Sequence, residues 1–336
     1  MKLQQLRYVL AVAENGLNIT AAAERLHTSQ PAVSKQIRQL EDELGLKLFI
    51  RRGKSLTEIT VEGREVIERA AVILREAENI RRIAQNINKD NRGLLSIGTT
   101  HTQARYVLPR AIAKFRADYP DVSLSLHQGT SEQLADMVEA KRVEFVIATG
   151  GDELFPNLLR LPCYRWDRVI LVPADHPLTR LERPATLQDL AEYPLVTYVF
   201  SERGESSFRS AFERQGLTPE VVFTARDADV IKTYVRLGMG VGVVAAMAVD
   251  PADKELVALS AAGLFPRVTT WIGFRPETVL RDFMYDFIAG FAAHLDPWAV
   301  RRLVQAENEE VRQALLDEFV LPRRGADGAL LPIIER

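Results

Sequence analysis

The sequence predicts an α/β protein with three parts: a small helical head, one long helix, and a larger body of strands and helices. Three observations predict this fold class. The first sixty residues carry apolar stripes with the helical period, broken by turn residues. Residues 61–88 repeat an apolar position every seven residues without a break. From residue 94 onward, short apolar runs alternate with helical stretches.

Composition narrows the class of protein. The chain has 336 residues, enough for two or three domains, and its 47% hydrophobic and 26% charged residues are typical of a globular protein. No apolar run approaches the roughly 18 residues that a membrane helix needs, so we expect no membrane partner. No apolar leader follows Met1–Arg7, and Cys163 has no second cysteine to pair with. We therefore expect a cytoplasmic protein with no cofactor and no metal cluster.

Charge is distributed unevenly along the chain. The net charge is only −2, but residues 1–59 contain nine basic and six acidic residues, so the remainder is acidic. A basic head on an acidic body predicts that the head, rather than the whole chain, contacts a polyanion.

The head reads as a helix-turn-helix. An amphipathic first helix stops near Asn15-Gly16, and a second spans about 19–26. A third begins at Ser29, a good N-cap, with Pro31 in its first turn. Its apolar stripe is Val33, Ile37 and Leu40. This pattern of two short helices, a tight turn and a helix with a polar outer face predicts a DNA-binding domain. The alternative is a helical bundle whose polar face is only solvated.

Polar residues of the third helix and of the following hairpin are the candidate DNA contacts. The hairpin at about 47–57 has a basic tip, as a wing that meets phosphate or the minor groove would. The candidates are Thr28, Ser29, Gln30, Pro31, Ser34, Lys35 and Arg38 on the third helix, and Arg51, Arg52 and Lys54 on the wing.

These segments carry a family resemblance. Residues 6–8, 21–26, 28–34, 48–49 and 57–63 resemble the winged helix-turn-helix of LysR-type transcriptional regulators. The resemblance implies that residues 1–60 form a winged helix-turn-helix domain whose partner is double-stranded promoter DNA.

Residues 61–92 predict a linker helix that pairs two chains. Val66, Ile73, Ile80 and Ile87 are seven residues apart, and an alanine stands three before each isoleucine. A stripe this narrow favours a partner helix, and paired heads suit a two-fold DNA site. The alternative is a lone helix packed on its own domain.

The body predicts α/β units around a cleft. Strands are expected at 94–98, 122–127, 145–148, 169–172, 195–198, 221–223 and 241–244, with helices at about 104–119, 132–140, 205–215 and 228–237. Such alternation indicates parallel sheets. Beyond residue 296 a helical stretch is expected at 300–319, followed by a loose end.

Threonines at strand ends predict an anion site in the body. Thr100, Thr102 and Gln103 lie where a strand meets a helix, and Thr149 follows the strand 145–148. Hydroxyl and amide donors at strand carboxyl ends suit a small oxyanion. For any single threonine, the alternative is helix capping.

Nearly the whole chain resembles one subgroup of the family. Residues 99–109, 161–166, 193–198 and 223–238 resemble the CysB/Cbl subgroup of sulfur-assimilation regulators. This implies a periplasmic-binding-protein-like effector domain over 93–295 with two subdomains, about 93–163 with 267–295 and about 164–266, and a helical tail over 296–336. The anion site matches at Thr100, Thr102, Gln103 and Thr149. Implied effectors are sulfate, thiosulfate, O-acetylserine, N-acetylserine or adenosine phosphosulfate.

One loop departs from the subgroup. After Phe200 the subgroup continues Gly-Phe-Thr-Gly, whereas this chain has Ser201-Glu202-Arg203-Gly204. Ser201 and Arg203 therefore join the candidate effector-binding residues, and Arg203 favours a larger or doubly charged anion, such as an organosulfonate-related compound.

The sequence thus predicts a LysR-type regulator of sulfur assimilation, cysteine biosynthesis or sulfonate utilisation genes, and no enzyme. A dimer or homotetramer and RNA polymerase are the further partners expected. The alternative is an anion-binding protein of the transport type, against which the basic head argues. The lone Cys163 is expected to be buried and inert.

Overall fold

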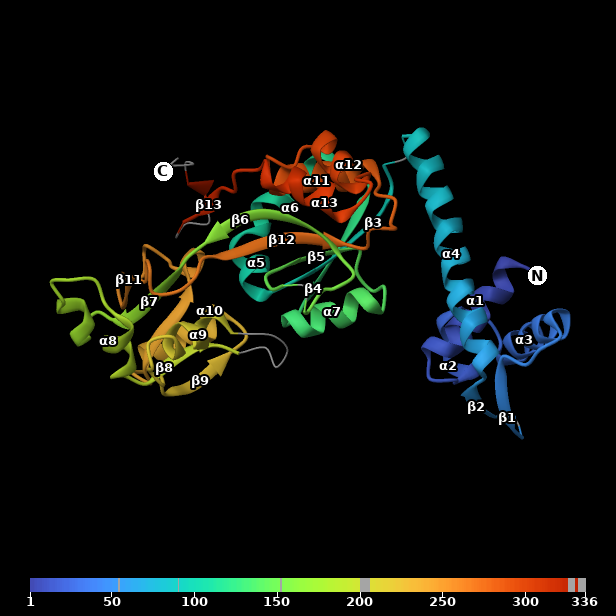
Figure 1. Ribbon diagram of the computed structural model, residues 1–336, viewed down its shortest axis with the longest axis horizontal. Coiled ribbons are helices and arrows are strands. Elements are labelled where there is room, and N and C mark those ends of the chain that lie inside the picture. Colours follow the sequence, from blue (N-terminus) through green and yellow to red (C-terminus); the bar gives the residue numbers. More distant parts are fainter. Residues whose placement is uncertain (54, 90, 152, 200–205, 326–329, 332–336) are drawn as a thin grey trace. The chain divides into compact units, whose positions relative to one another are not determined.

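The computed structural model describes residues 1–336 except 54, 90, 152, 200–205, 326–329 and 332–336. The chain forms two compact units, Met1–Asp90 and Asn91–Arg336 (Figure 1). Within the described residues no helix is both long and apolar enough to cross a membrane.

The first unit is the predicted winged helix-turn-helix followed by a long helix. Its elements are α1 (Leu3–Glu14), α2 (Ile19–Arg25), α3 (Gln30–Leu44), β1 (Phe49–Arg52), β2 (Ser55–Ile59) and α4 (Val61–Ile87). The expected stripe of α3 is fully buried. Strands β1 and β2 pair antiparallel as the wing (Figure 1).

Helix ends in this unit follow the local chemistry, with one exception. The Asn18 side chain accepts hydrogen bonds from Thr20 N and Ala21 N and so caps α2. Gly45, at φ +70°, ends α3 in the left-handed conformation that glycine adopts without strain. Ser29 stands at the N-cap of α3 as predicted, but its side chain makes no capping hydrogen bond. Ser29 is exposed to solvent.

Helix α4 changes character along its length. Near its start, Ala70 is buried in the core of the first unit, with Val66, Ile67 and Leu74 packed against that core. Further along, Ile80 and Ile87 are 68% and 76% exposed. The early positions of the seven-residue repeat therefore pack on their own unit, as the alternative interpretation expects, whereas pairing of two chains through the exposed later positions stays a prediction.

The larger sheet of the second unit has seven strands in the order β14-β13-β6-β12-β5-β3-β4. Their bounds are β3 (Gly93–Thr99), β4 (Val122–Gln128), β5 (Phe145–Ala148), β6 (Leu159–Trp166), β12 (Val268–Phe274), β13 (Arg323–Arg324) and β14 (Leu330–Leu331). Associated helices are α5 (His101–Tyr106), α6 (Leu108–Asp118), α7 (Ser131–Glu139), α11 (Asp282–Phe291), α12 (Pro297–Val304) and α13 (Glu309–Asp317). In Figure 1 the helices α11, α12 and α13 gather beside this sheet.

The second sheet has five strands in the order β11-β7-β10-β8-β9. They are β7 (Arg168–Pro173), β8 (Leu195–Tyr198), β9 (Val221–Ala225), β10 (Val241–Ala245) and β11 (Leu256–Ser260). The helical elements are η1 (Pro177–Arg180), α8 (Leu187–Ala191), α9 (Ser207–Glu213), α10 (Ala228–Arg236) and η2 (Ala246–Ala248). The chain passes between the two sheets twice, from β6 to β7 and from β11 to β12 (Figure 1).

The expectation of parallel sheets was wrong in part. Strands β3, β4 and β5 are parallel, but β12 runs antiparallel to both β5 and β6, and β7 runs antiparallel to β10 and β11. Each of these four antiparallel contacts involves a strand next to a passage between the sheets. The returning chain enters from the opposite end, so it cannot run parallel to its neighbours.

Two expected helices are each broken into two. The helix expected at 104–119 is divided at Val107 into α5 and α6, because Pro109 has no amide with which to continue the α5 ladder. The helix expected at 300–319 is divided into α12 and α13, where Asn308 caps a new start by accepting from Val311 N.

Candidate functional sites

The outer face of α3 presents the predicted DNA-contacting side chains to solvent. Ser29, Gln30 and Pro31 are exposed at its start, Lys35 and Arg38 are exposed further along, and Thr28 and Ser34 are half-buried. Among the described residues, neither Lys35 nor Arg38 forms an ion pair. Two cations without a protein anion, beside hydroxyl and amide groups, suit phosphate and base edges.

The wing arginines differ from one another. Arg52 is exposed, whereas Arg51 is half-buried with Nη2 3.4 Å from Glu41 Oε2. Glu41 is 1% exposed, and its Oε1 accepts hydrogen bonds from the amides of Leu48 and Phe49. Arg51 therefore also anchors the wing to α3. The sequence analysis did not identify Glu41. The one indication in the sequence is that this acidic residue occupies a position on the buried side of α3. Lys54 lies outside the described residues.

The predicted effector loop joins β3 to α5. Thr100 is the N-cap residue of α5, yet its side chain makes no capping hydrogen bond and is half-buried. Thr102 is 8% exposed, and its Oγ1 lies 3.4 Å from the hydroxyl of Tyr198 at the end of β8. Burial raises the pKa of Tyr198, so its hydroxyl stays neutral and able to donate. The loop thus meets the five-stranded sheet through hydroxyl groups.

Gln103 is held inside the protein. It is 1% exposed, its Nε2 donates to Thr270 Oγ1 at 3.2 Å, and its Oε1 accepts from the Tyr164 hydroxyl. Trp166 Nε1 donates to the same Thr270 oxygen at 3.0 Å. Both polar atoms of the Gln103 amide are therefore engaged by β6 and β12, an arrangement that fixes the loop.

Thr149 lies at the same sheet edge as the loop. Strands β3 and β5 are parallel neighbours with Thr99 opposite Ile147, so Thr100 and Thr149 follow adjacent strand ends. Gly150, at φ +113°, accepts hydrogen bonds at its carbonyl from Trp271 Nε1 and Arg160 Nη1. These contacts fix the backbone directly after Thr149.

The remaining predicted effector residues, Ser201 and Arg203, lie outside the described residues. A half-buried cation, Arg168, lies near Tyr198. Burial lowers the pKa of Arg168 to about 10, which leaves it charged at neutral pH, and Arg168 acts electrostatically on Tyr198.

A polar cluster that the sequence did not reveal joins α5 to α10. Tyr106 donates to Asp229 at 2.7 Å, and Lys232 Nζ lies 2.9 Å from Asp229. Burial opposes ionisation of Asp229, but hydrogen bonds from Tyr106 and Lys232 outweigh it and lower its pKa. The carboxylate therefore stays charged and ties the two helices together.

His101 borders this cluster. Its ring lies with Asp227 and Asp229 in a group whose possible metal-ligating atoms are all within 4.8 Å of one another. Asp229 is already neutralised by Lys232 and by Arg105, whose Nε lies 2.5 Å away. We therefore interpret this group as a contact between α5 and α10 rather than as a metal site.

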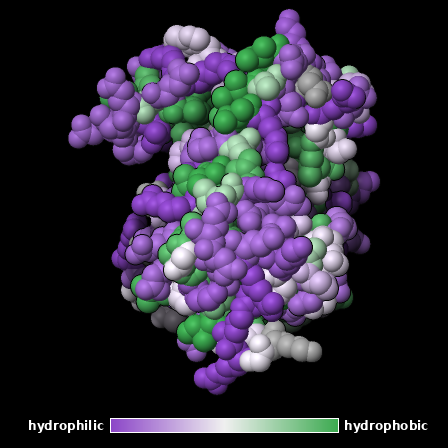
Figure 2. All heavy atoms as spheres, turned by 90° about the vertical axis from the view of Figure 1, so that its right-hand side faces the viewer, coloured by the Kyte–Doolittle hydropathy of each residue, from purple (hydrophilic) through white to green (hydrophobic). Residues whose placement is uncertain are grey.

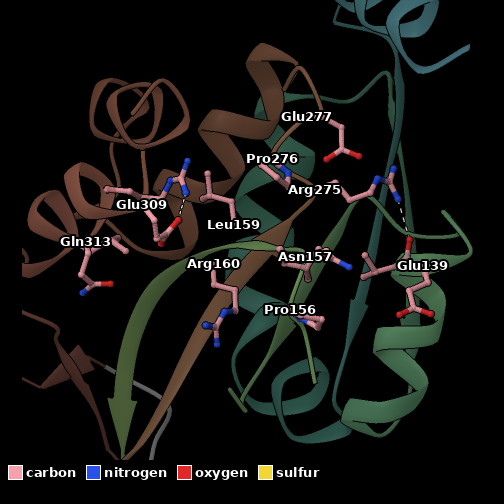
Figure 3. Close-up of a pocket in the computed structure, with 14 residues that line it drawn as sticks. Glu139, Pro156, Asn157, Leu159, Arg160, Arg275, Pro276, Glu277, Glu309 and Gln313 are labelled. Carbon is pink, nitrogen blue, oxygen red and sulfur yellow. Dashed lines mark hydrogen bonds and ion pairs between the residues drawn. The ribbon is translucent and has the colours of Figure 1, made fainter. Parts of the chain in front are cut away.

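Two surface pockets share the C-terminal tail as a wall, and neither is lined by Thr100, Thr102 or Thr149. The larger, about 870 Å³, places Glu309 and Gln313 of α13 opposite Glu139 of α7 (Figure 3). The smaller, about 560 Å³, is lined by Arg165, Arg267 and Phe319 among others. The tail thus shapes the surface of the second unit.

Cys163 is fully buried on β6. Burial raises the pKa of its thiol, and Sγ contacts the Leu161 carbonyl at 3.3 Å. The prediction that Cys163 is buried is confirmed, and its lack of reactivity stays a prediction.

Family models match most of the chain. The model described as a bacterial regulatory helix-turn-helix protein of the lysR family matches residues 3–64, and the LysR substrate binding domain model matches residues 88–296. Curated relatives include the regulator CysB of Haemophilus influenzae, 47% identical over 88% of this chain and 91% of that one, and SsuR of Burkholderia cenocepacia, 45% identical over 91% and 99%. The regulator cbl of Escherichia coli is 40% identical over 92% and 98%.

Solved structures agree. The cofactor-binding domain of the Cbl transcriptional regulator is 39% identical, with a TM-score of 0.60 over 65% of this chain and 96% of that one. A full-length OxyR variant from Pseudomonas aeruginosa is 26% identical, with a TM-score of 0.66 over 87% and 94%. The chain belongs to the LysR family of DNA-binding transcriptional regulators and is not an enzyme.

Proposed function

We propose that the chain regulates sulfur assimilation, cysteine biosynthesis or sulfonate utilisation genes in response to a small anionic effector related to sulfur metabolism. The observation that carries this proposal is the set of threonine hydroxyls at adjacent strand ends, Thr100 and Thr149, with Thr102 beside Tyr198. Relatives named CysB, SsuR and cbl, at 40–47% identity, support the sulfur assignment.

The chemistry of these side chains favours an oxyanion. Neutral hydroxyl groups donate hydrogen bonds to an anion without neutralising it, and the charge of Arg168 adds attraction. Sulfate, thiosulfate, O-acetylserine, N-acetylserine, adenosine phosphosulfate and sulfonates all present an oxyanion of this kind. Gln103 fits this pocket as a residue that holds the loop, whereas Thr100, Thr102 and Thr149 supply donors.

The DNA assignment rests on the exposed face of the first unit. Residues 1–60 serve as the reader of double-stranded promoter DNA, with Gln30, Ser34, Lys35 and Arg38 toward the major groove and Arg52 toward phosphate. Residues 61–92 pair two chains, residues 93–295 bind the effector, and residues 296–336 form a tail. The protein works as a dimer or tetramer in the cytoplasm, with RNA polymerase as a further partner.

A thermal-shift experiment tests the pocket. A saturating anion that binds only the folded chain adds about 2.7 kcal/mol at a hundred times its dissociation constant, enough to raise the melting temperature by several degrees. We expect sulfate, thiosulfate, N-acetylserine or a sulfonate to produce this rise in the unaltered chain, and Thr100→Ala and Thr102→Ala to abolish it.

Thr130→Ala is the matched control. Thr130 caps α7 by accepting from Gln133 N, so its loss lowers the melting temperature without touching the pocket. The control should keep the ligand-induced rise. An undiminished rise in both pocket variants would show that the anion binds elsewhere.

A further inference from the structure

The C-terminal tail reaches the interior of the effector-binding unit. Strand β13 lies parallel to β6, with Arg323 opposite Arg165 and Arg324 opposite Trp166. Arg165 N donates to the Pro322 carbonyl at 2.9 Å, which fixes the register. These residues lie beyond 296, where the match to the family model ends. The strand therefore adds something to the sheet that the family model does not include.

Arg323 holds this strand at the passage between the two sheets. Its guanidinium pairs with Asp167, the residue between β6 and β7. The same carboxylate lies 3.5 Å from Nε of Arg267, which directly precedes β12. The Asp167 carbonyl also accepts from Ala246 N at the end of β10. One carboxylate thus links the tail to both crossing strands.

Arg324 continues from that anchor toward the effector loop. Its guanidinium carbon lies 4.5 Å from the ring centroid of Tyr164 and 5.8 Å from that of Phe291. The Tyr164 hydroxyl donates to Gln103, whose amide in turn donates to Thr270. A cation stacked on a buried tyrosine restricts where that ring and its hydroxyl lie. The path from tail to loop has only two side chains between Arg324 and the backbone of α5.

We propose that Arg324 is a positioning residue for effector binding, acting through Tyr164 and Gln103 on the loop that carries Thr100 and Thr102. The inference rests on the proposed function in one respect, that this loop binds the anion. Arg324 does not touch the anion. It sets the position of Gln103 at the third residue of α5, and with it the direction in which the threonine hydroxyls point.

The test compares Arg324→Leu with Arg302→Leu in the full chain. Arg302 lies 4.6 Å from the ring centroid of Trp298, a cation–π contact of similar distance on an exposed ring of α12. Among the described residues, neither of these two side chains forms a hydrogen bond, ion pair or ring contact with Tyr164 or Gln103. Arg324→Lys keeps the positive charge over Tyr164 and serves as the conservative rescue.

Hydrogen–deuterium exchange without any ligand is the first readout. We expect Arg324→Leu to speed exchange in peptides covering 99–107, while peptides of α7 and α10 and the Arg302→Leu variant stay unchanged. Two results would overturn the inference. Faster exchange throughout the second unit would show that Arg324 only stabilises the fold, and an unchanged exchange rate in the loop would show that Arg324 is not coupled to it.

Calorimetric titration with sulfate, thiosulfate and N-acetylserine is the second readout. For the anion that binds, we expect Arg324→Leu to weaken affinity by about tenfold, Arg324→Lys to recover most of the loss, and Arg302→Leu to bind normally. Normal affinity in Arg324→Leu, with loss in Thr102→Ala, would refute the positioning role and leave the pocket standing. If no anion binds the unaltered chain, the proposed function fails, and the exchange experiment still decides whether the tail orders the loop.

Discussion

A chain in which Lys35 and Arg38 are both alanine should bind duplex DNA at least about tenfold more weakly than the unaltered chain at physiological salt. Both side chains are exposed on α3, and among the described residues neither forms an ion pair. Both positive charges are therefore available to bind DNA. Each lost phosphate contact should also flatten the dependence of log affinity on log salt by about 0.9.

Fluorescence anisotropy with a labelled promoter duplex, repeated across potassium chloride concentrations, measures both effects. The control is Arg110→Ala with Lys114→Ala, which removes the same charge from an exposed face of α6 in the second unit. If the Lys35→Ala and Arg38→Ala double variant has the same affinity and salt dependence as the unaltered chain, α3 does not form the DNA-binding face.

Acidic substitution on the linker helix is expected to have the second large effect. Ile80→Glu with Ile87→Glu places two carboxylates in the stripe that remains exposed beyond Ala70. In a paired helix each carboxylate would be desolvated opposite its copy, and such burial without a partner charge is strongly unfavourable. We expect sedimentation analysis to show a shift from dimer or tetramer toward monomer, and DNA binding to weaken with it.

Leu237→Glu serves as the control for this experiment. Leu237 is 70% exposed directly after α10 and does not belong to the seven-residue repeat of α4. Figure 2 shows hydrophobic patches that interrupt an otherwise mostly hydrophilic surface. An unchanged oligomeric state in the α4 variant would assign the pairing to another surface.

The elements that local periodicity marks could be predicted from the sequence. Val33, Ile37 and Leu40 define the buried side of α3, and therefore also its exposed side. The strands β5 and β8 have the predicted bounds, Phe145–Ala148 and Leu195–Tyr198, because each is a short, mostly buried apolar run. In each case one segment contains its own signal.

Features that depend on distant contacts could not be predicted. Glu41 is buried because the amides of Leu48 and Phe49 approach it only after the wing forms. Strand β6 was missed because Pro162 and Arg165 interrupt its apolar alternation. Its partner β12 lies about a hundred residues later in the chain.

The candidate effector site divides in the same way. The positions of Thr100 and Thr149 at strand ends follow from the local pattern. That Gln103 turns into the core follows only from Tyr164 and Thr270, which the fold brings to it. The tail contact at Arg324 has no local signal either, since a two-residue strand has no period to detect.

Binding of the anion is expected to alter the affinity of the protein for DNA, and promoter affinity measured by anisotropy with and without the anion tests this coupling. We predict that a saturating sulfur anion changes promoter affinity by roughly 5- to 150-fold, the usual range for coupled sites, and that Thr102→Ala removes the change while still binding DNA. If promoter affinity stays constant with each of the candidate effectors, in a chain that binds the duplex well, effector binding and DNA binding are not coupled.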